Sequence, residues 1–355
     1  MARSRIYLDH AATSPLRPEA RAAMEEGVAI WANPSSPHAE GRKAKQALED
    51  ARARVKAALK WDGEVIFTSG ASEALWIALN RAKVDRRIVS AVEHDAVFRA
   101  APDAEVVPID PRGVMEGDLD LAKLDPLLDS GAKAIVAIQH INSETGTNQY
   151  VTRNPPHRDH VVQAGSWLLA DCSQSAGKME LPDADMLVVS AHKFGGPIGI
   201  GALLVRDYAM LEPMGGHERG YRQGTENMPA ALGMAAALEA GDIETWATTV
   251  EQQFDFKNEL FRHGEVLRMG MHCSHIIAVA HPTMSAQAQL IRLDAMGFAV
   301  SAGSACSSGT LKKSRVLDAF GVPDDVAART IRVSMGWSTT PEELDAFAEA
   351  WASLS

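Results

Sequence analysis

One lysine stands in a local sequence that suits covalent chemistry. Lys193 follows the apolar segment Met186–Val189 and lies beside Ser190, His192 and a run rich in glycine. Small residues let the backbone approach a ligand closely. A lysine that is shielded from water and close to cations has a lowered pKa, and its amine can form a Schiff base with an aldehyde. The alternative is an ordinary solvated lysine, so the rest of the chain has to decide.

Short polar or glycine-containing turns follow four other apolar segments that we predict to be strands. They are Gly70, Ala71 and Ser72 after Glu64–Thr68, His94 after Arg87–Ala91, Asn142 and Ser143 after Ala134–Ile138, and Asp171 and Gln174 after Trp167–Ala170. Ligands bind beyond the carboxyl ends of the strands in an open α/β sheet. Each residue taken singly also fits an ordinary cap or turn. Their common position predicts one shared site.

These residues together supply what a pyridine-phosphate cofactor requires. Backbone N–H groups and a hydroxyl at the helix start near Ser72 form a natural phosphate cup. Asp171 could hold a ring nitrogen protonated, and His94 could stack on the ring. Gln174 could donate to a ring oxygen, while Lys193 holds the aldehyde.

Two residues far downstream could act on a substrate. Cys306 lies in a segment of glycine, alanine and serine, 300–309, with no apolar neighbours to pack against. This setting predicts an accessible, reactive thiol that needs a nearby cation or proton acceptor. Arg332 stands inside the otherwise apolar segment Thr330–Ser334. Its charge needs a partner, and either a substrate carboxylate or an internal aspartate would serve.

The elements that must position these residues follow an alternating pattern. Apolar segments alternate with amphipathic ones up to about residue 245, which predicts an α/β fold with a doubly wound, mostly parallel sheet covered on both faces. The helix Ala39–Lys60 is charge-rich, and we expect it to present a solvated face. Further predicted strands are Glu105–Ile109 and Ala202–Val205, and further predicted helices are Glu19–Ala32, Ser72–Lys83, Leu119–Leu128 and Pro229–Ala240.

The pattern changes beyond residue 245. A long charged helix around Thr245–Arg262 precedes strands near Ile276–Ala280, Phe298–Val300 and Thr330–Ser334, and a last helix begins at Pro341. This order predicts a second, smaller α+β domain.

Composition narrows the class of protein. The 355 residues are 46% hydrophobic and 23% charged, which suits two folded domains. A net charge of −11 argues against general nucleic-acid binding. We find no signal-peptide core and no run of membrane-spanning length, and we expect no membrane association. Three cysteines are too few for a disulfide scaffold or a Cys-rich zinc site, so we predict a cytoplasmic protein in which Cys172 and Cys273 are structural.

The ordered motifs resemble those of the cysteine desulfurases of the nitrogen-fixation and iron–sulfur-cluster type, which are class-V aminotransferase-like enzymes. The similarity runs nearly end to end. It covers Tyr7–Pro15, Asn33–Ser36, Thr68–Glu73, Glu93 and His94, Asn142–Gly146, Asp171–Gln174, Ser190–Lys193, Gly215–Thr225, Gly303–Cys306, and Ile331 and Arg332.

This resemblance implies a fold and a set of residue roles. It implies a fold type I enzyme that binds pyridoxal 5′-phosphate, with a large cofactor-binding domain at 13–245 and a small domain at 1–12 and 246–355 that carries the cysteine loop. Lys193, Cys306 and His94 would be catalytic. The cofactor would contact Lys193, Ala71, Ser72, His94, Asn142, Ser143, Asp171, Gln174, Ser190, His192 and Thr225, and the substrate would contact Arg332 and Asn33.

The resemblance also implies a reaction and partners. L-cysteine would become L-alanine, with the sulfur held as a persulfide on Cys306 and passed to an iron–sulfur scaffold or a tRNA-thiolation protein. Thr225 would reach the phosphate of a neighbouring subunit, which implies a homodimer. Two positions depart from the family pattern: Ser143 stands where many relatives have asparagine, and Ser72 replaces a common threonine.

Other functions remain open at this point. The nearest alternative is a selenocysteine lyase or another class-V aminotransferase-type reaction. A catalytically silent adaptor is a second alternative, and joint retention of the site residues argues against it. A nicotinamide dehydrogenase fits poorly, because no Gly-x-Gly-x-x-Gly follows a strand and opens a helix.

Overall fold

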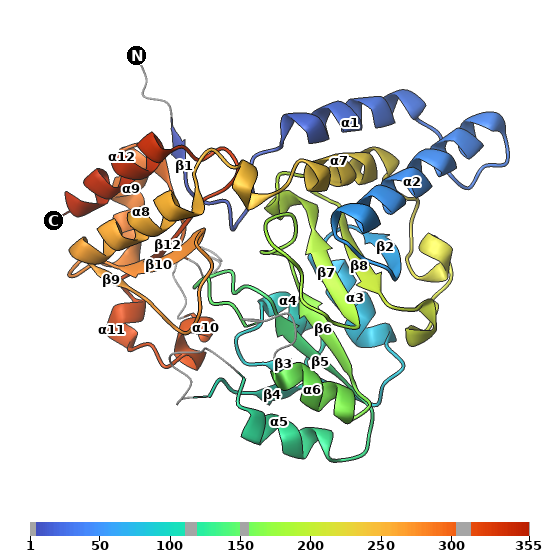
Figure 1. Cartoon of the computed structure of the whole chain (residues 1–355), viewed down its shortest axis with the longest axis horizontal. Helices are drawn as coiled ribbons and strands as arrows, with labels where there is room; N and C mark the ends of the chain where they lie inside the picture. Colours follow the sequence, from blue (N-terminus) through green and yellow to red (C-terminus); the bar gives the residue numbers. More distant parts are fainter. Residues whose placement is uncertain (1–4, 111–118, 150–155, 303–313, 355) are drawn as a thin grey trace.

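A seven-stranded sheet forms the centre of the larger part of the molecule (Figure 1). The computed structural model describes residues 5–110, 119–149, 156–302 and 314–354. The strand order across the sheet is β2-β8-β7-β6-β5-β3-β4. The strands are β2 (Glu64–Thr68), β3 (Arg86–Ser90), β4 (Glu105–Val107), β5 (Ala134–Gln139), β6 (Trp167–Asp171), β7 (Met186–Ser190) and β8 (Gly201–Val205).

Most pairs in this sheet are parallel, as the alternating pattern predicts. The pairs β3–β4, β3–β5, β5–β6 and β6–β7 are parallel, and β8 is antiparallel to both β2 and β7. Each predicted strand is present, with ends shifted by at most two residues. The largest shift is in β4, which ends at Val107 because Pro108 has no N–H to continue the ladder.

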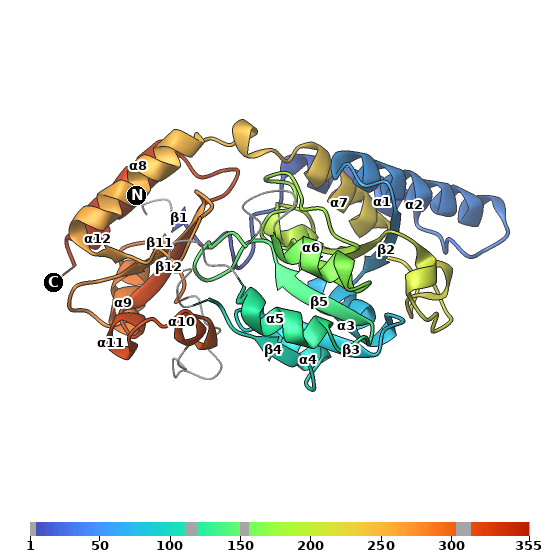
Figure 2. The same ribbon diagram turned by 60° about the horizontal axis from the view of Figure 1, so that its bottom comes forward.

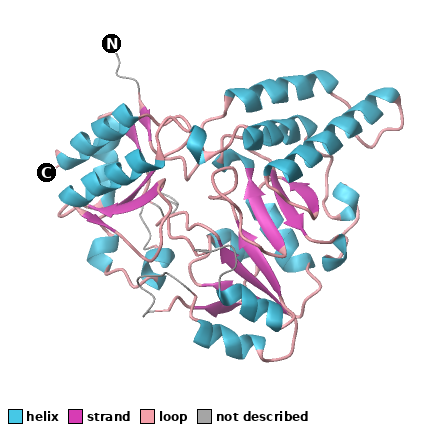
Figure 3. Cartoon of the chain, in the orientation of Figure 1, coloured by secondary structure: helices cyan, strands magenta, loops and turns pink. Residues whose placement is uncertain are grey.

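Helices cover both faces of the sheet (Figure 3), which confirms the doubly wound architecture. Successive strand residues point to opposite faces. Val65 and Phe67 therefore pack in one core, and Ile66 packs in the other. The first core is completed by α1 (Pro18–Ile30), α2 (Ala39–Ala58), α5 (Leu121–Leu128), α6 (Pro156–Gln163) and α7 (Met228–Glu239), and the second by α3 (Ala71–Arg81) and α4 (Asp95–Ala100).

The charged helix α2 differs in one respect from the expectation. Its small and aliphatic residues, such as Ala44 and Leu48, pack in the core beside α7, and Lys43 and Lys45 are exposed as predicted. Arg52, however, is buried. A solvated face therefore describes only part of this helix.

A second, smaller α+β unit stands beside the large sheet (Figure 2). Its three-stranded antiparallel sheet has the order β12-β10-β9, and the N-terminal strand β1 pairs in parallel with β11. The elements are β1 (Ile6–Tyr7), β9 (Glu265–Val266), β10 (Ile276–Ala280), β11 (Phe298–Ala299), β12 (Thr330–Ser334), α8 (Val250–His263), α9 (Ala286–Ala295), α10 (Arg315–Ala319), α11 (Asp324–Ala327) and α12 (Pro341–Ala352). The stated domain boundaries stay a prediction.

Two helix starts in this unit are set by capping boxes. Thr249 and Gln252 cap α8, and Thr340 and Glu343 cap α12. The predicted helix around Thr245 is consequently divided, with a short 3-10 turn at Ile243–Thr245 before α8 begins at Val250. The last helix begins at Pro341, as predicted. Among the described helices, none combines the length and the apolar character needed to cross a membrane.

Substitution of an aromatic residue tests the packing in the core of the smaller unit. Phe347 is fully buried between the rings of Phe256 and Phe298. We expect Phe347→Ala to lower the free energy of unfolding by about 3–5 kcal/mol, because it leaves a cavity. Phe261→Ala, at a side chain on α8 that is 56% exposed, should change it by no more than about 0.5 kcal/mol. Urea unfolding curves that give both variants the same free energy of unfolding would contradict this description of the core.

Candidate active site

Lys193 lies where the large sheet meets the N-terminal segment. A 3-10 turn (Ala191–Lys193) follows β7 and carries this residue. Its Nζ donates to the carbonyl oxygens of Ala11 at 2.7 Å and Ala12 at 2.9 Å. Burial lowers the pKa of Lys193 to about 8, and the charge of Arg332 contributes, while Asp171 and Asp9 oppose the shift. The amine is therefore far more nucleophilic near neutral pH than an ordinary lysine.

Asp171 and Gln174 lie beside it at the end of β6. Asp171 is buried, and its Oδ1 accepts hydrogen bonds from the N–H of Ser173 at 2.9 Å and from its hydroxyl at 2.6 Å. The Nε2 of Gln174 donates to the carbonyl oxygen of Ala11 at 2.9 Å. Its buried Oε1 has no partner among the described residues. The sequence analysis expected Gln174 to donate to a ring oxygen, but its Nε2 is used within the protein and the free atom is an acceptor. A ligand hydroxyl at this point would have to donate.

His94 caps the first turn of α4. Its Nδ1 accepts a hydrogen bond from the N–H of Ala96 at 3.1 Å. Desolvation lowers the pKa of His94, the charge of Asp171 opposes the shift, and Lys193 adds to it. The imidazole is consequently neutral near pH 7, with its proton on Nε2, although the side chain keeps an exposed part. A neutral ring fixed by its cap suits stacking on a planar ligand.

The predicted phosphate cup is assembled from three adjacent strands and one helix start. Thr68, Gly201 and Ser190 are paired in register across β2, β8 and β7. Gly70 adopts a φ of +150°, which only glycine accepts readily, and an added Cβ there would lie 4.0 Å from the Oγ of Ser190. A Cβ on Gly201 would approach the Cα of Gly70 to 2.8 Å, so glycine is required there.

Donors converge on this cup. The first N–H groups of α3, at Ala71 and Ser72, have no acceptor within the helix, and the Ser72 side chain is exposed. His192 pairs through Nδ1 with the Oγ1 of Thr13 at 3.0 Å. Burial lowers the pKa of His192 to about 4, with smaller contributions from Lys193 and Lys178. These groups can bind an anion at the positive end of a helix dipole.

Arg332 forms the opposite wall, on β12. Its Nη2 donates to the Oδ1 of Asp9 at 2.7 Å, and its Nη1 donates to the carbonyl oxygen of Ser143 at 2.9 Å. The Nε is buried and has no partner within the described part of the chain. The sequence analysis allowed either a substrate carboxylate or an internal aspartate as the partner of Arg332. In the structure an internal aspartate, Asp9, is that partner. Ser143 contributes its backbone to the site.

Asn142 has a different position from the one expected of a cofactor ligand. Its Oδ1 accepts from the N–H groups of Glu144 and Thr145 and from the hydroxyl of Thr145, and its Nδ2 donates to the carbonyl oxygen of Val92. Both polar atoms are used within the protein. Asn142 shapes the turn that carries Ser143.

Two of the predicted site residues, Thr225 and Asn33, are not brought to these groups, and a third cannot be placed. Cys306 lies outside the described residues. Thr225 is exposed on the loop 213–227. Asn33 is exposed on the connection between α1 and α2, at the end of the molecule away from the small sheet (Figure 1). The 13-residue helix α1 separates it by roughly 20 Å from Arg17, whose N–H donates to Gly195 near the lysine.

Two further groups near the site were missed by the sequence analysis. Glu93 is fully buried, its Oε1 accepts from the N–H of Gln139 at 2.8 Å, and burial raises its pKa well above the usual range. Ser314 and Arg315 follow the cysteine segment directly. The Oγ of Ser314 donates to Glu144 at 2.6 Å, and Arg315 donates to the carbonyl oxygens of Ala91 and Glu93.

Sequence signals for these groups were weak. Glu93 precedes His94 in a recognised motif, but its burial depends on strand β5 beside it. Arg315 is one of several basic residues in its segment. Only the structure shows that Arg315, at the start of α10, is bonded to the residues on either side of His94.

The lowered pKa of Lys193 has a direct consequence for pH dependence. The deprotonated amine reacts with aldehydes, so lowering the pKa moves the onset of reaction to lower pH. We expect capture of pyridoxal by the cofactor-free protein, trapped with borohydride and located by mass spectrometry, to be half-maximal near pH 8. Lys193→Ala should remove the label. A midpoint near the ordinary value of 10.5 would contradict the burial described here.

Comparison with known proteins agrees with this geometry. Residues 6–347 match the family model "Aminotransferase class-V". The chain is 32% identical to cysteine desulfurase IscS of Dictyoglomus turgidum, over 96% of this chain and 92% of that protein, and 35% identical to a cysteine desulfurase of Rhodobacter capsulatus, over 97% and 94%. A solved NifS-like protein from Rickettsia africae superimposes with a TM-score of 0.84 at 26% identity, covering 98% of both chains. The chain therefore belongs to the class-V aminotransferase family, among its cysteine desulfurases.

Proposed function

We propose that this protein is a cysteine desulfurase that depends on pyridoxal 5′-phosphate and converts L-cysteine to L-alanine. The observation that carries the proposal is that Lys193, with its lowered pKa, and Arg332 are both bonded to the short segment 9–12, close enough for the charge of Arg332 to lower the pKa of the lysine. The lysine suits an aldehyde cofactor, and the arginine suits the carboxylate of an amino acid.

The residues present fit this cofactor. The buried, unpaired Oε1 of Gln174 awaits a donor, the Gly70 turn leaves room for a phosphate, and Asp171 can hold a ring nitrogen protonated. His94 would stack on the ring, and Ser72, Ser190 and His192 would bind the phosphate. When bound, pyridoxal phosphate supplies an aldehyde for the substrate amine and a ring that accepts electron density from the substrate.

The chain's own groups then perform the binding and proton steps. Arg332 would bind the cysteine carboxylate, using the Nε that has no protein partner and the Nη2 now held by Asp9. Lys193 would remove the Cα proton of the bound substrate as a general base. Its pKa of about 8 keeps a useful fraction of the amine unprotonated near neutral pH.

Sulfur transfer requires Cys306. Its thiolate would attack the sulfur of the bound cysteine, so that a sulfur–sulfur bond forms while the carbon–sulfur bond of the substrate breaks. The electron pair left on the carbon side ends in the new C–H bonds of alanine. Lys193 would return the Cα proton, and the proton given up by the Cys306 thiol would pass through His94 to the neighbouring carbon. The products are alanine and a persulfide on Cys306.

Two site residues indicate a homodimer. Asn33 and Thr225 are exposed and lie on connections outside the pocket of their own chain. We propose that each serves the site of a second copy, with Thr225 on its phosphate and Asn33 near its substrate. The site would then be complete only between two subunits.

The onward path of the sulfur is proposed from the relatives. The relative in Dictyoglomus turgidum carries the name IscS, and we propose an iron–sulfur scaffold or a tRNA-thiolation protein as the acceptor here. A cytoplasmic location stays a prediction, based on the few and scattered cysteines.

The reaction is tested by alanine release from L-cysteine in the presence of a reductant. We expect the wild type to release alanine and Cys306→Ala to release almost none, because the nucleophile is lost. Cys172→Ala is the matched control, since Cys172 is fully buried and burial raises the pKa of its thiol. Undiminished alanine release by Cys306→Ala would show that Cys306 is not the nucleophile, and consumption of cysteine without alanine release would favour an aminotransferase-type reaction.

A substitution of Arg332 should change the kinetics in a different way. Arg332→Lys keeps a positive charge but loses the planar fork that binds a carboxylate. We expect kcat/KM for cysteine to fall by roughly ten- to hundredfold, corresponding to about 1.5–3 kcal/mol for a charged hydrogen bond, mostly through KM. Arg329→Lys, at a guanidinium outside the pocket, should have little effect. An unchanged KM for Arg332→Lys would place the carboxylate elsewhere.

A further inference from the structure

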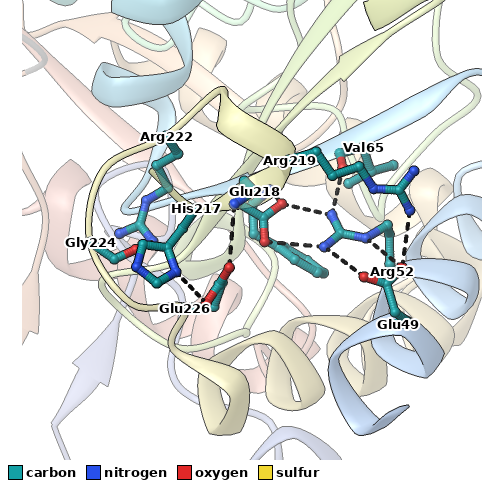
Figure 4. Close-up of polar contacts among 10 residues, drawn as sticks. Glu49, Arg52, Val65, His217, Glu218, Arg219, Arg222, Gly224 and Glu226 are labelled. Atoms are coloured by element: carbon teal, nitrogen blue, oxygen red, sulfur yellow. Dashed lines mark hydrogen bonds and ion pairs between the residues drawn. The ribbon is translucent and has the colours of Figure 1, made fainter. Parts of the chain in front are cut away.

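A buried ion pair joins helix α2 to the loop 213–227. Arg52 and Glu218 form two hydrogen bonds, Nη1 to Oε2 at 2.7 Å and Nη2 to Oε1 at 3.1 Å (Figure 4). Their side chains are only 6% and 1% exposed. Burying two charges is costly unless their geometry and their other hydrogen bonds are nearly complete. Such a pair is therefore expected where it fixes a particular arrangement.

The pair also closes the edge of the large sheet. β2 is an outer strand, bonded on one side to β8. On its open edge the N–H of Phe67 donates to Glu218 at 2.8 Å, and the carbonyl oxygen of Val65 accepts from Arg52 at 2.6 Å. An exposed edge would leave these backbone groups unpaired. Glu218 and Arg52 take the place of a neighbouring strand and attach the loop to the sheet.

The loop at Glu218 is held in an unfavourable backbone conformation. Glu218 has a φ of 48° and Arg219 has a φ of 57°, in the left-handed region that residues with a Cβ rarely adopt. Conformations of this kind persist where the surroundings over-determine them. The bonds of Glu218 to the guanidinium of Arg52 and to the backbone of Phe67 provide that constraint.

Further polar contacts hold the rest of the loop 213–227 in place around Glu218. Glu226 accepts from the backbone N–H of Glu218 at 3.3 Å and pairs with the Nδ1 of His217 at 3.0 Å. Arg222 forms an ion pair with Glu73, in the first turn of α3, at 3.3 Å. Thr225 lies between Arg222 and Glu226 and is exposed. The loop is thus held on both sides of Thr225, whose exposed hydroxyl has no hydrogen bond to another described residue.

We propose that Glu218, held by Arg52, is a positioning residue that fixes the loop 213–227 so that Thr225 is presented to the phosphate cup of a second copy of this chain. The proposal deepens the proposed function and rests on it, because the phosphate and the second copy belong to that function. A hydroxyl on a loop without this anchor would lose conformational freedom on binding, and its contribution to phosphate affinity would fall.

The first test compares two ligands, pyridoxal 5′-phosphate and pyridoxal, which lacks the phosphate. Their dissociation constants are measured by absorbance on the cofactor-free protein. Glu218→Gln keeps the shape and can still accept from Phe67, but it loses the charge that holds Arg52. We expect at least a tenfold loss of affinity for pyridoxal phosphate and less than a twofold change for pyridoxal. Thr225→Ala should give the same selective loss.

Two further variants sharpen this test. Arg52→Lys retains the charge without the fork, and we expect an intermediate and equally selective loss, which keeps the test usable if Glu218→Gln folds poorly. Glu239→Gln is the matched control, because Glu239 pairs with another arginine of α2, Arg54, through two hydrogen bonds and lies outside the loop. It should change neither constant. Equal losses for both ligands, or no loss for pyridoxal phosphate, would overturn the proposal.

The second test asks which subunit the anchor serves. In mixed dimers of Glu218→Gln and Lys193→Ala chains, every site with a lysine receives its loop from a chain with an intact Glu218. We expect the affinity of that site for pyridoxal phosphate, followed by borohydride labelling of Lys193, to return to the wild-type value. Affinity that stays as low as in the Glu218→Gln homodimer would show that the loop acts within its own chain and would overturn the proposal.

These readouts also separate the inference from the reaction itself. Neither binding test depends on alanine release, so a protein that binds the cofactor as described but does not act on cysteine would overturn the proposed reaction alone. A wild-type protein that binds pyridoxal as tightly as pyridoxal phosphate would overturn both.

Discussion

Two cationic side chains, Lys193 and Arg332, share a pocket that is largely shielded from water, and this constraint determines much of the site. Burial of the lysine and, to a smaller extent, the charge of Arg332 lower the pKa of Lys193 to about 8, and the carboxylates of Asp171 and Asp9 limit the shift. Electrostatic interactions are stronger in such surroundings than in water. A free, unprotonated amine beside a guanidinium is suited to an amino-acid substrate, whose carboxylate can replace Asp9 on the arginine.

The N-terminal segment holds both cations in place. Asp9 binds Arg332, and the carbonyl oxygens of Ala11 and Ala12 accept from Lys193. The same segment continues into hydrogen bonds between Ser14 and the backbone of His192 and Lys193. Its strand β1 pairs with β11 of the small sheet. One short stretch of chain therefore connects the two sheets and sets the distance between the cofactor side and the substrate side of the pocket.

The elements of the large sheet could be predicted because local signals agree: near-continuous apolar strands, amphipathic helices and glycines at the turns. Lys193, Asp171, Gln174 and His94 could be placed at one edge, because the carboxyl ends of parallel strands meet there. Asp9 could not, since its partner is 323 residues away and nothing in the local sequence distinguishes it from a turn residue. Arg52 resembled its charged neighbours on α2, and only Glu218, 166 residues later, accounts for its burial. Contacts of this range depend on tertiary packing and not on periodicity.

The charges of Arg332 and Asp9 influence the pKa of Lys193, and titration of Lys193 in two variants tests this coupling most directly. The pH midpoint of aldehyde capture by Lys193 is measured for Asp9→Asn and for Arg332→Met beside the wild type. Removing the carboxylate should lower the pKa of Lys193 below the wild-type value, and removing the guanidinium should raise it, because Asp9 raises this pKa and Arg332 lowers it. A midpoint that stays the same or falls in Arg332→Met would contradict the account.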